Sequence, residues 1–260
     1  MPEPDTDGTV ATSDSAVSRA DPQRVAVVIP SYNHGHYLEE TIQSVLAQTR
    51  RPDRILILDD GSADDSLEVA RSFSSHGVEV EAQENAGAHV ALNRLVAKAA
   101  RDCGTIAILN SDDHFLPDRL ATCLAALETN PRAELICTPL ELIDDDGREL
   151  SKDHPRSRWF ASAWSPREEG ALSLASWLGM ANFPATTSNI VARSAFLSAN
   201  PMRDYRFCHD YFLLASAAIA GSMVILPGPA MLQYRVHASN TITTTPEVLV
   251  REMARMRLEL

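Results

Sequence analysis

The chain has 260 residues, of which 45% are hydrophobic and 22% charged, values typical of a globular protein with one large domain. Its net charge of −12 argues against nucleic acid as a partner, because a phosphate backbone is bound by a basic surface. The acidic first residues lack the pattern of a signal peptide, and no run of roughly 20 apolar residues predicts a transmembrane span. We therefore expect a cytoplasmic protein.

A segment without apolar periodicity precedes the first regular pattern. Residues 1–22 are rich in Asp, Ser, Thr, Pro and Ala. Such a segment cannot bury enough apolar surface to offset the entropy lost when it becomes ordered. We therefore predict that residues 1–22 form a disordered tail.

Short apolar runs alternate with helical patterns in the first half of the chain. The expected strands are 25–29, 54–58, 78–80 and 105–109, and the expected helices are 37–48, 64–72 and 88–100. Apolar runs of this length are typical of strands buried on both faces, and the alternation predicts a mostly parallel α/β sheet flanked by helices. Polar turns follow three of these strands at their carboxyl ends, which is where open α/β sheets bind ligands.

The pattern becomes less regular beyond residue 118. We expect helices at 118–129 and 210–220, strands at 134–142, 190–192 and 223–226, an acidic turn at 144–147 and an irregular stretch over 151–170. This part is expected to be a smaller extension of the same domain.

The last residues, 246–260, have an amphipathic pattern. Leu249, Met253, Met256 and Leu260 recur at helical spacing, which predicts a helix with one apolar face. That face could pack on its own domain, on a second copy of the chain in a homodimer, or on a membrane surface. The mixed charges of the helix make a membrane surface the weakest of the three.

Two acidic clusters follow expected strands. Asp59 and Asp60 end the second strand, and Asp112 and Asp113 lie just past the fourth. Because the carboxyl ends of parallel strands meet at one edge, the clusters can converge, and like charges held close together need a cation or a proton. A divalent metal, Mn²⁺ or Mg²⁺, would also let this acidic chain hold a phosphate-bearing small molecule. The alternative is that these residues serve as turn and helix-capping residues.

Five short motifs stand in a fixed order along the chain. They are VVIPSYN at 27–33, LDDGS at 58–62, ENAG at 84–87, NSDD at 110–113 and YRVH at 234–237. This set resembles the family 2 glycosyltransferases, which have the GT-A fold. The resemblance implies one Rossmann-like GT-A domain over 23–245, with a nucleotide-binding half at 23–128 and an acceptor half at 129–245.

The resemblance also implies nucleotide contacts, residue by residue. They are Pro30, Tyr32, Asn33, Asp60, Asn85, Gly87, Asn110 and Ser111. Within this set, Asp60 would bind the base and Asn110 a ribose hydroxyl. The family usually has Asp-x-Asp at the end of the fourth strand, so Asn110 is a departure that removes one negative charge while keeping the ability to form hydrogen bonds.

The remaining implied roles concern the metal, the base and the diphosphate. Asp112 would bind the divalent metal, and His237 would either complete that site or be structural. Asp210 would be the catalytic base, with helix capping as the alternative. Further candidate contacts with the diphosphate or the sugar are Asp113, Asn189, Arg206 and Arg235.

The resemblance implies an inverting glycosyltransferase. It would move a sugar from a UDP or dTDP donor to a hydroxyl or amine of a sugar, lipid-linked or natural-product acceptor. The alternative is a non-catalytic sugar-nucleotide-binding protein with a degenerate site, which Asn110 and His209 favour because both depart from the family pattern.

Overall fold

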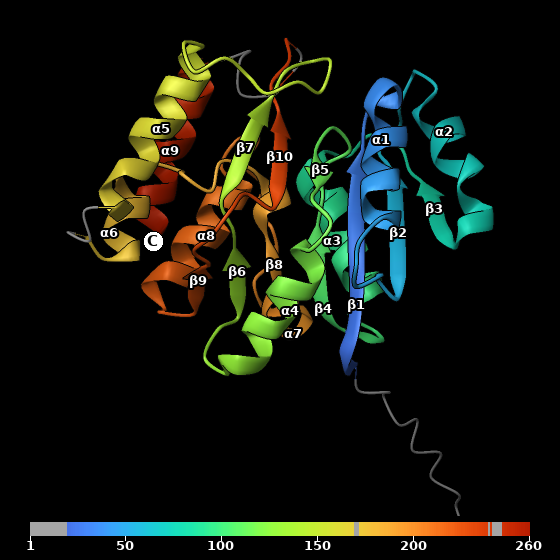
Figure 1. Cartoon of the computed structure of the whole chain (residues 1–260), viewed down its shortest axis with the longest axis horizontal. Coiled ribbons are helices and arrows are strands. Elements are labelled where there is room, and N and C mark those ends of the chain that lie inside the picture. The colour runs from blue at the N-terminus through green and yellow to red at the C-terminus, as the bar shows by residue number, and fades with distance from the viewer. Residues whose placement is uncertain (1–19, 169–171, 239, 241–245) are drawn as a thin grey trace, which may run out of the picture.

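The computed structural model of the chain describes residues 20–168, 172–238, 240 and 246–260 (Figure 1). A seven-stranded sheet has the order β3-β2-β1-β4-β8-β6-β9, and a three-stranded sheet has the order β5-β10-β7. The strands are β1 (Asp21–Ser31), β2 (Arg54–Asp59), β3 (Val78–Ala82), β4 (Cys103–Ile108), β5 (His114–Phe115), β6 (Leu135–Cys137), β7 (Leu140–Ile143), β8 (Val191–Arg193), β9 (Met223–Ile225) and β10 (Leu232–Arg235).

Helices surround the two sheets. They are α1 (Gly35–Leu46), α2 (Ser66–Ser72), α3 (Ala88–Ala99), α4 (Arg119–Thr129), α5 (Pro155–Glu168), α6 (Leu174–Met180), α7 (Ser194–Ala199), α8 (His209–Ile219) and α9 (Pro246–Glu259), with short 3-10 helices η1 (Ser74–His76) and η2 (Thr187–Asn189). None of the helices in the described ranges is long and apolar enough to cross a membrane.

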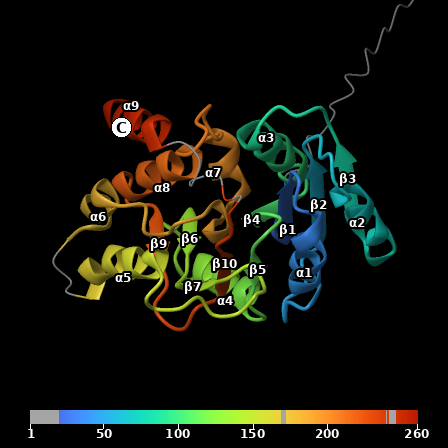
Figure 2. The ribbon, with the colours of Figure 1, turned by 90° about the horizontal axis from the view of Figure 1, so that it is seen from above.

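The apolar run of β1 packs against helices on both faces of the large sheet. Val27 lies in one buried cluster with Ile42 of α1, whereas Val28 lies in another with Leu92 of α3. Figure 2 shows α1 and α3 on opposite sides of β1. Successive side chains of a strand point to opposite faces, so an uninterrupted apolar strand needs cover on both. Strands β1, β2, β3 and β4 pair in parallel, which confirms the expected parallel α/β sheet flanked by helices.

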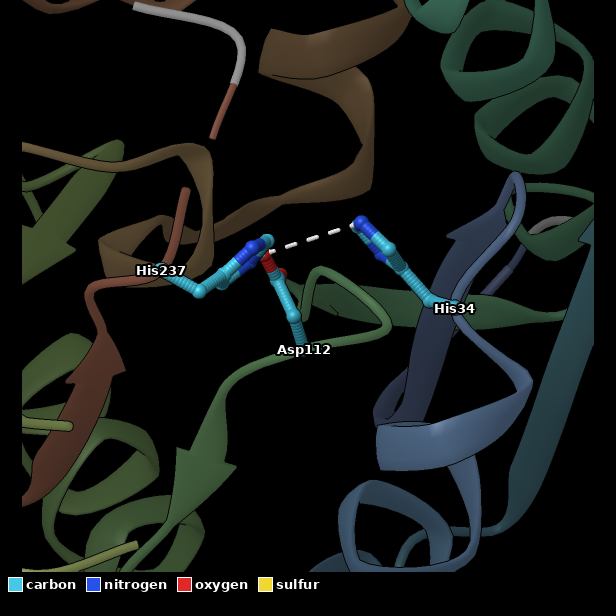
Figure 3. A group of neighbouring side chains, drawn as sticks. All are labelled: His34, Asp112 and His237. Atoms are coloured by element: carbon cyan, nitrogen blue, oxygen red, sulfur yellow. Dashed lines mark hydrogen bonds and ion pairs between the residues drawn. The ribbon is translucent and has the colours of Figure 1, made fainter. Parts of the chain in front are cut away.

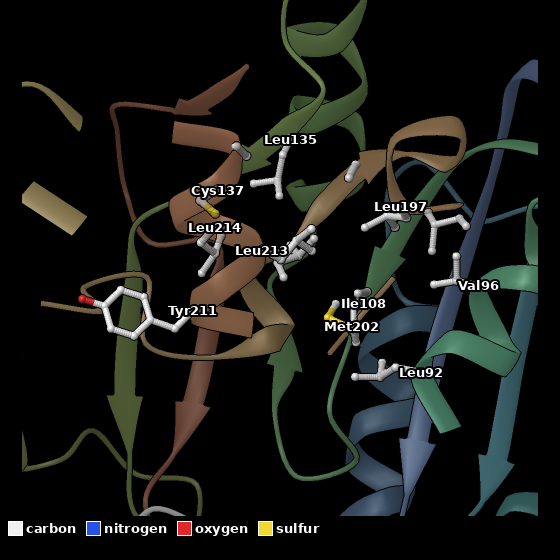
Figure 4. Packing of buried hydrophobic residues seen from close by; sticks show 14 of the residues in the cluster. Leu92, Val96, Ile108, Leu135, Cys137, Leu197, Met202, Tyr211, Leu213 and Leu214 are labelled. Atoms are coloured by element: carbon white, nitrogen blue, oxygen red, sulfur yellow. The ribbon is translucent and has the colours of Figure 1, made fainter. Parts of the chain in front are cut away.

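The second half of the chain extends the same sheet and shares its core. Strand β8 pairs antiparallel with both β4 and β6, and β9 pairs in parallel with β6. Leu92 of α3 and Ile108 of β4 lie in one buried cluster with Leu197 of α7 and Leu213 of α8 (Figure 4). The segments on either side of residue 128 are therefore held together by one hydrophobic core.

The single strand expected over 134–142 is wrong, because the structure has two strands there in different sheets. Strand β6 belongs to the large sheet, and β7 pairs with β10 in the small one. Between them, Thr138 donates its backbone N–H to the Asn189 side chain at 2.9 Å, and Pro139 has no N–H to donate. The ladder therefore breaks, and the chain crosses from one sheet to the other.

The irregular stretch expected over 151–170 is also wrong, because α5 occupies most of it. The apolar residues of α5 form no stripe at helical spacing, so periodicity gives no signal. The helix is held instead by tertiary contacts. Ala163 accepts a hydrogen bond from the indole N–H of Trp177 at 2.7 Å, and the Trp164 ring packs edge-on against Trp177 and Phe183.

The first strand begins earlier than expected. Residues 1–19, most of the expected tail, lie outside the described residues. Asp21 and Pro22 belong to β1, and the backbone N–H of Asp21 donates to the carbonyl of Asp102 at 3.2 Å. The strand thus starts two residues inside the segment predicted to be a tail.

Helix α9 packs against its own domain. Met256 is buried in the core, and Leu249 and Met253 pack against the same cluster, whereas Leu260 is exposed. The carboxylate of Glu252 accepts the backbone N–H groups of residues 206 and 207 at 2.7 and 2.8 Å. The predicted amphipathic helix is therefore present, and its apolar face serves its own domain. A homodimer through this helix stays a prediction.

We expect Met256→Ala to lower the free energy of unfolding by about 2–4 kcal/mol, because it removes a buried side chain and leaves a cavity. Met256 is 1% exposed, whereas Leu258 on the same helix is 89% exposed. Leu258→Ala should therefore change the free energy of unfolding by less than about 0.5 kcal/mol. Urea denaturation followed by circular dichroism measures both. Equal losses in the two variants would contradict the docking of α9 through Met256.

Candidate active site

A cleft of about 700 Å³ opens at the carboxyl ends of β1, β2 and β4. Its lining comes from the turns after these strands, the start of α3, the loop before β8 and the loop that leads into α8. All eight residues expected to contact the nucleotide line it, namely Pro30, Tyr32, Asn33, Asp60, Asn85, Gly87, Asn110 and Ser111. The candidate metal ligand Asp112, the candidate base Asp210 and Arg206 line the same cleft. Their contacts with a ligand stay predictions.

Three side chains could hold a metal ion, and two of them, His34 and Asp112, line the cleft. The three are His34, Asp112 and His237, whose candidate ligand atoms all lie within 4.8 Å of one another (Figure 3). The Nε2 atom of His237 lies 3.0 Å from Asp112 Oδ2, and the Nε2 atom of His34 lies 4.0 Å from the same oxygen. Asp112 Oδ1 is buried, and no group among the described residues forms a hydrogen bond with it. One carboxylate and two imidazoles, with a buried oxygen unpaired, fit a divalent cation.

The Asp112 carboxylate is suited to the ionised form that a metal requires. Burial alone raises its pKa, but the hydrogen bond with His237 and the charges of His34 and His237 outweigh burial. The net effect is a pKa below the ordinary value of an Asp carboxyl. Asp112 can therefore act as an anionic ligand at neutral pH.

The position of His34 is set by the turn between β1 and α1. Asn33 adopts a φ of 53°, in the left-handed region that Asn tolerates, and this directs the chain from the strand into the helix. The backbone N–H groups of Asn33 and His34 donate to the hydroxyls of Ser62 and Ser66, both at 2.9 Å. The His34 ring then reaches Ser111 through Nδ1 at 2.8 Å.

Sequence reasoning missed His34 as a site residue. The signal available was a histidine directly after a strand that carries a ligand motif. What makes it relevant is the pairing of β1 with β4, which brings the ends of the two strands side by side. A sequence alone does not give that pairing.

Asp113 lies next to Asp112 but faces the protein interior. It is fully buried, and one of its oxygens accepts the hydroxyls of Thr186 and Ser188, while the other accepts the backbone N–H of Arg235 at 3.0 Å. Burial, followed by the charge of Asp112, raises the pKa of Asp113 well above its usual range. Asp113 therefore joins the end of β4 to η2 and to β10.

Arg235 and Asn189 are also bound within the protein. Arg235 is 1% exposed and donates to the carbonyls of Asp112, Asp144 and Asp145 and to the carboxylate of Glu40. Asn189 is fully buried, and its side chain pairs with the backbone of residue 138. Sequence analysis made Asp113, Arg235 and Asn189 candidate contacts for the diphosphate or sugar. None of the three is among the residues that line the cleft, and their contacts with a diphosphate or sugar stay predictions.

Asp60 holds segment 83–87, part of which lines the cleft. Its carboxylate accepts hydrogen bonds from the Gln83 side chain at 2.7 Å and from the backbone N–H groups of Ala86 and Gly87, both at 2.9 Å. Gly87 has a φ of 94°, which only glycine adopts at low cost. Asp60 thus fixes the 83–87 segment, and its contact with a base stays a prediction.

The structure gives a local reason for Asn110. Its side-chain amide donates to the Thr186 hydroxyl at 3.0 Å, and that hydroxyl donates to Asp113 at 3.1 Å. A carboxylate at position 110 could not donate to Thr186, and the single hydroxyl proton cannot serve two carboxylates. Asn110, in place of the first Asp of the family pattern, therefore allows the Thr186 hydroxyl to donate to the buried Asp113.

Asp210 lies in the first turn of α8, at the cleft. The N-cap position is Cys208, so Asp210 is the second residue of the helix and not its cap. It is 6% exposed, and its carboxylate accepts the backbone N–H of Tyr211 at 2.7 Å. Burial raises the pKa of Asp210, although the charge of His209 and the hydrogen bonds oppose it. A buried carboxylate with a raised pKa at a cleft is suited to accept a proton.

Curated relatives of the chain are glycosyltransferases. The chain is 27% identical over 224 residues to an uncharacterized glycosyltransferase of Nostoc sp., which covers 84% of this chain and 66% of the relative. It is 33% identical over 133 residues to the putative teichuronic acid biosynthesis glycosyltransferase TuaG of Bacillus subtilis, which covers 49% of this chain and 51% of the relative. The chain thus matches about half to two thirds of the length of these relatives.

Solved structures with the same fold include those of TarS and of glucosyl-3-phosphoglycerate synthase. TarS of S. aureus in complex with UDP superposes with a TM-score of 0.62 at 15% identity, over 90% of this chain and 64% of that one. Glucosyl-3-phosphoglycerate synthase from Mycobacterium tuberculosis, in complex with Mn²⁺, UDP and glucosyl-3-phosphoglycerate, superposes with a TM-score of 0.56 at 16% identity, over 91% and 79%. At such identities the likeness shows the fold alone, which is the GT-A fold.

The family model described as Glycosyl transferase family 2 matches residues 26–184, more than half of the chain. This range contains four of the five motifs, the turns that end β1, β2 and β4, and the metal-type residues His34 and Asp112. The chain therefore belongs to glycosyl transferase family 2.

Proposed function

We propose that the chain is a metal-dependent, inverting glycosyltransferase that uses a nucleoside-diphosphate sugar. The observation that carries this proposal is the meeting of two kinds of group at one cleft. A metal-type cluster contains Asp112 and His237, and a buried carboxylate with a raised pKa is supplied by Asp210. A metal held by the cluster would bind the diphosphate of the donor, and the Asp210 carboxylate would accept the proton of the acceptor.

The donor is proposed to be a UDP or dTDP sugar. Eight residues that resemble the nucleotide contacts of the family line the cleft, and the similar TarS structures include complexes with UDP and with UDP-GlcNAc. A divalent cation, Mn²⁺ or Mg²⁺, would be held by Asp112 and His237, and when bound it neutralises negative charge on the departing diphosphate. The unpaired, buried Oδ1 of Asp112 supports this ligand role.

Asp210 is proposed to act as the general base in a single displacement. The acceptor oxygen or nitrogen forms a bond to the anomeric carbon while the bond between that carbon and the diphosphate oxygen breaks. The acceptor proton moves to the Asp210 carboxylate, which is ready to take it because burial raises its pKa. Attack from the face opposite the leaving group inverts the anomeric configuration.

The acceptor is proposed to be a sugar, lipid-linked or natural-product hydroxyl or amine. The names of the relatives TuaG and chondroitin synthase concern polysaccharides, which supports a glycan among these classes. The loop that leads into α8 borders the cleft beside Asp210 and would meet the acceptor. Arg206 in this loop is exposed and lines the cleft, so it stays a candidate contact for the diphosphate.

The rival function is non-catalytic binding of a sugar nucleotide. Asn110 favours it because it departs from the family pattern, but the hydrogen bond from Asn110 to Thr186 gives that departure a structural reason. Release of nucleoside diphosphate from a donor in the presence of Mn²⁺ separates the two functions. A binding protein would hold the donor without releasing the diphosphate.

Asp210→Asn is expected to abolish sugar transfer while leaving nucleotide binding intact, because it removes the base without changing the size of the side chain. In the unchanged chain, the rate should fall as pH drops through the raised pKa of Asp210, since only the ionised carboxylate accepts a proton. The acidic limb should therefore lie at a higher pH than that of an ordinary Asp carboxyl, roughly pH 4. Steady-state kinetics across pH and calorimetry with UDP measure these outcomes.

The control for this experiment is Asp146→Asn in the exposed turn after β7, which should transfer sugar at the rate of the unchanged chain. Wild-type turnover by Asp210→Asn, or an acidic limb at the ordinary Asp value, would show that another group is the base.

Asp112→Asn is expected to weaken UDP binding in the presence of Mn²⁺ by about tenfold or more, because it removes the anionic ligand. With a chelator in place of Mn²⁺, UDP binding by the variant and by the unchanged chain should differ little. Titration calorimetry with UDP under both conditions gives the comparison. An equal loss with Mn²⁺ and with chelator would contradict a metal-ligand role for Asp112.

A further inference from the structure

We propose that His34 is a third protein ligand of the cation, so that two imidazoles and one carboxylate hold it and favour Mn²⁺ and related transition metals over Mg²⁺. This inference rests on the proposed metal site of Asp112 and His237 and adds to it both a ligand and a preference among metals. His34 enters from β1, whereas Asp112 follows β4 and His237 follows β10. Three separate parts of the chain thus converge on one point (Figure 3).

The spacing of the three side chains suits a shared ion. Ligand atoms bound about 2.1 Å from a metal lie roughly 3.0–3.5 Å from one another. The imidazole nitrogens lie 3.0 Å (His237) and 4.0 Å (His34) from Asp112 Oδ2. The rings of His34 and His237 are 5.6 Å apart and nearly perpendicular, so they do not stack in place of binding an ion. A small rotation of the His34 side chain would shorten the 4.0 Å separation between its Nε2 atom and Asp112 Oδ2 to the distance that a shared ion requires.

The side-chain hydrogen bond of His34 uses Nδ1 and leaves Nε2 available to bind a metal ion. Its Nδ1 atom lies 2.8 Å from Ser111 Oγ. When Nδ1 carries the proton it donates to Ser111, and Nε2 presents its lone pair toward Asp112. Metal-binding histidines are commonly oriented in this way, with one ring nitrogen bound to the protein and the other to the metal. Within the described ranges of the chain, no hydrogen bond to His34 Nε2 is present.

The backbone that carries His34 is fixed before any ligand arrives. The N–H groups of His34 and Gly35 donate to the side chains of Ser66 and Asp64 at 2.9 and 3.0 Å. A Cβ at position 35 would lie 1.9 Å from the Asp65 carboxylate and 3.0 Å from the backbone nitrogen of Ser66, so only a glycine fits there without movement of its neighbours. The segment at the start of α2 therefore packs directly against the start of α1. Because this backbone is already fixed, His34 loses little conformational entropy when it binds an ion.

The ligand set determines which metals bind best. Mg²⁺ prefers oxygen ligands in octahedral geometry and is rarely held by histidine. Imidazole nitrogens suit Mn²⁺, Co²⁺ and Zn²⁺, and affinity rises from Mn²⁺ to Co²⁺. With one histidine the site would still be dominated by oxygen from Asp112, the diphosphate and water. With two histidines, the protein's own ligands favour transition metals over Mg²⁺.

The test measures metal binding directly on the full chain. Mn²⁺ binding is followed by the electron paramagnetic resonance signal of free Mn²⁺, with and without UDP, and Mg²⁺ is added as a competitor. We expect His34→Gln to weaken Mn²⁺ binding by about tenfold or more and to change Mg²⁺ competition much less. The matched control is His36→Gln, an exposed histidine two residues further along the chain in α1, which should behave as the unchanged chain.

A second substitution tests the preference among metals without removing a ligand. In His34→Glu a carboxylate of similar reach replaces the imidazole, so the site should keep a cation while the ratio of Mn²⁺ to Mg²⁺ affinity falls. An unchanged ratio in His34→Glu would overturn the inference. Retention of a cation by this variant also shows that the chain remains folded.

Asp112→Asn separates the inference from the proposed function. If Asp112→Asn loses Mn²⁺ while His34→Gln matches His36→Gln, the proposed site stands and the role of His34 is overturned. If Asp112→Asn binds Mn²⁺ as the unchanged chain does, the metal part of the proposed function fails. If His34→Gln weakens UDP binding equally with Mn²⁺ and with chelator and leaves Mn²⁺ binding unchanged, His34 contacts the nucleotide and the inference is overturned.

Discussion

Two neighbouring carboxylates are buried just after β4, and many of the surrounding hydrogen bonds compensate for the cost of burying them. Asp112 and Asp113 are 6% and 0% exposed, and like charges at this distance are costly unless each is compensated. The two are compensated differently. Asp113 turns inward to the hydroxyls of Thr186 and Ser188, whereas Asp112 turns toward two histidines at the cleft. Asp113 joins separate parts of the fold, whereas Asp112 belongs to the group of side chains that could hold a metal ion.

Arg235 connects this pair to the small sheet. Its backbone N–H binds Asp113, and its guanidinium binds the carbonyl of Asp112 and the acidic turn after β7. A buried guanidinium with carbonyl and carboxylate partners fixes the direction of the strand that carries it. Because Arg235 ends β10, it also fixes the point from which the chain continues to His237. The small sheet is thus part of the site's support.

The regular half of the fold could be predicted from the sequence because its signals are local. The apolar runs of β1, β2 and β4 and the helical spacing of α1 and α3 are each visible within about a dozen residues, and the resemblance gave the fold that joins them. Features that depend on contacts distant in the sequence could not be predicted in this way. The β6–β7 break depends on Asn189 binding Thr138, and α5 depends on Trp164 and Trp177.

The same distinction applies to the site. The eight candidate nucleotide contacts could be found because each belongs to a short motif, and all eight line the cleft. His34 was missed because its relevance depends on the pairing of β1 with β4. The burial of Asp113 and Arg235 could not be predicted, because a motif shows which residues are near a site but not which way each side chain turns.

The hydrogen-bond relay from Asn110 through Thr186 to Asp113 also constrains how this sequence can change over time. Exchanging Asn110 for the Asp usual in the family would place two carboxylates against one hydroxyl proton. Positions 110 and 186 are therefore coupled: a carboxylate at 110 becomes tolerable only if residue 186 supplies another donor.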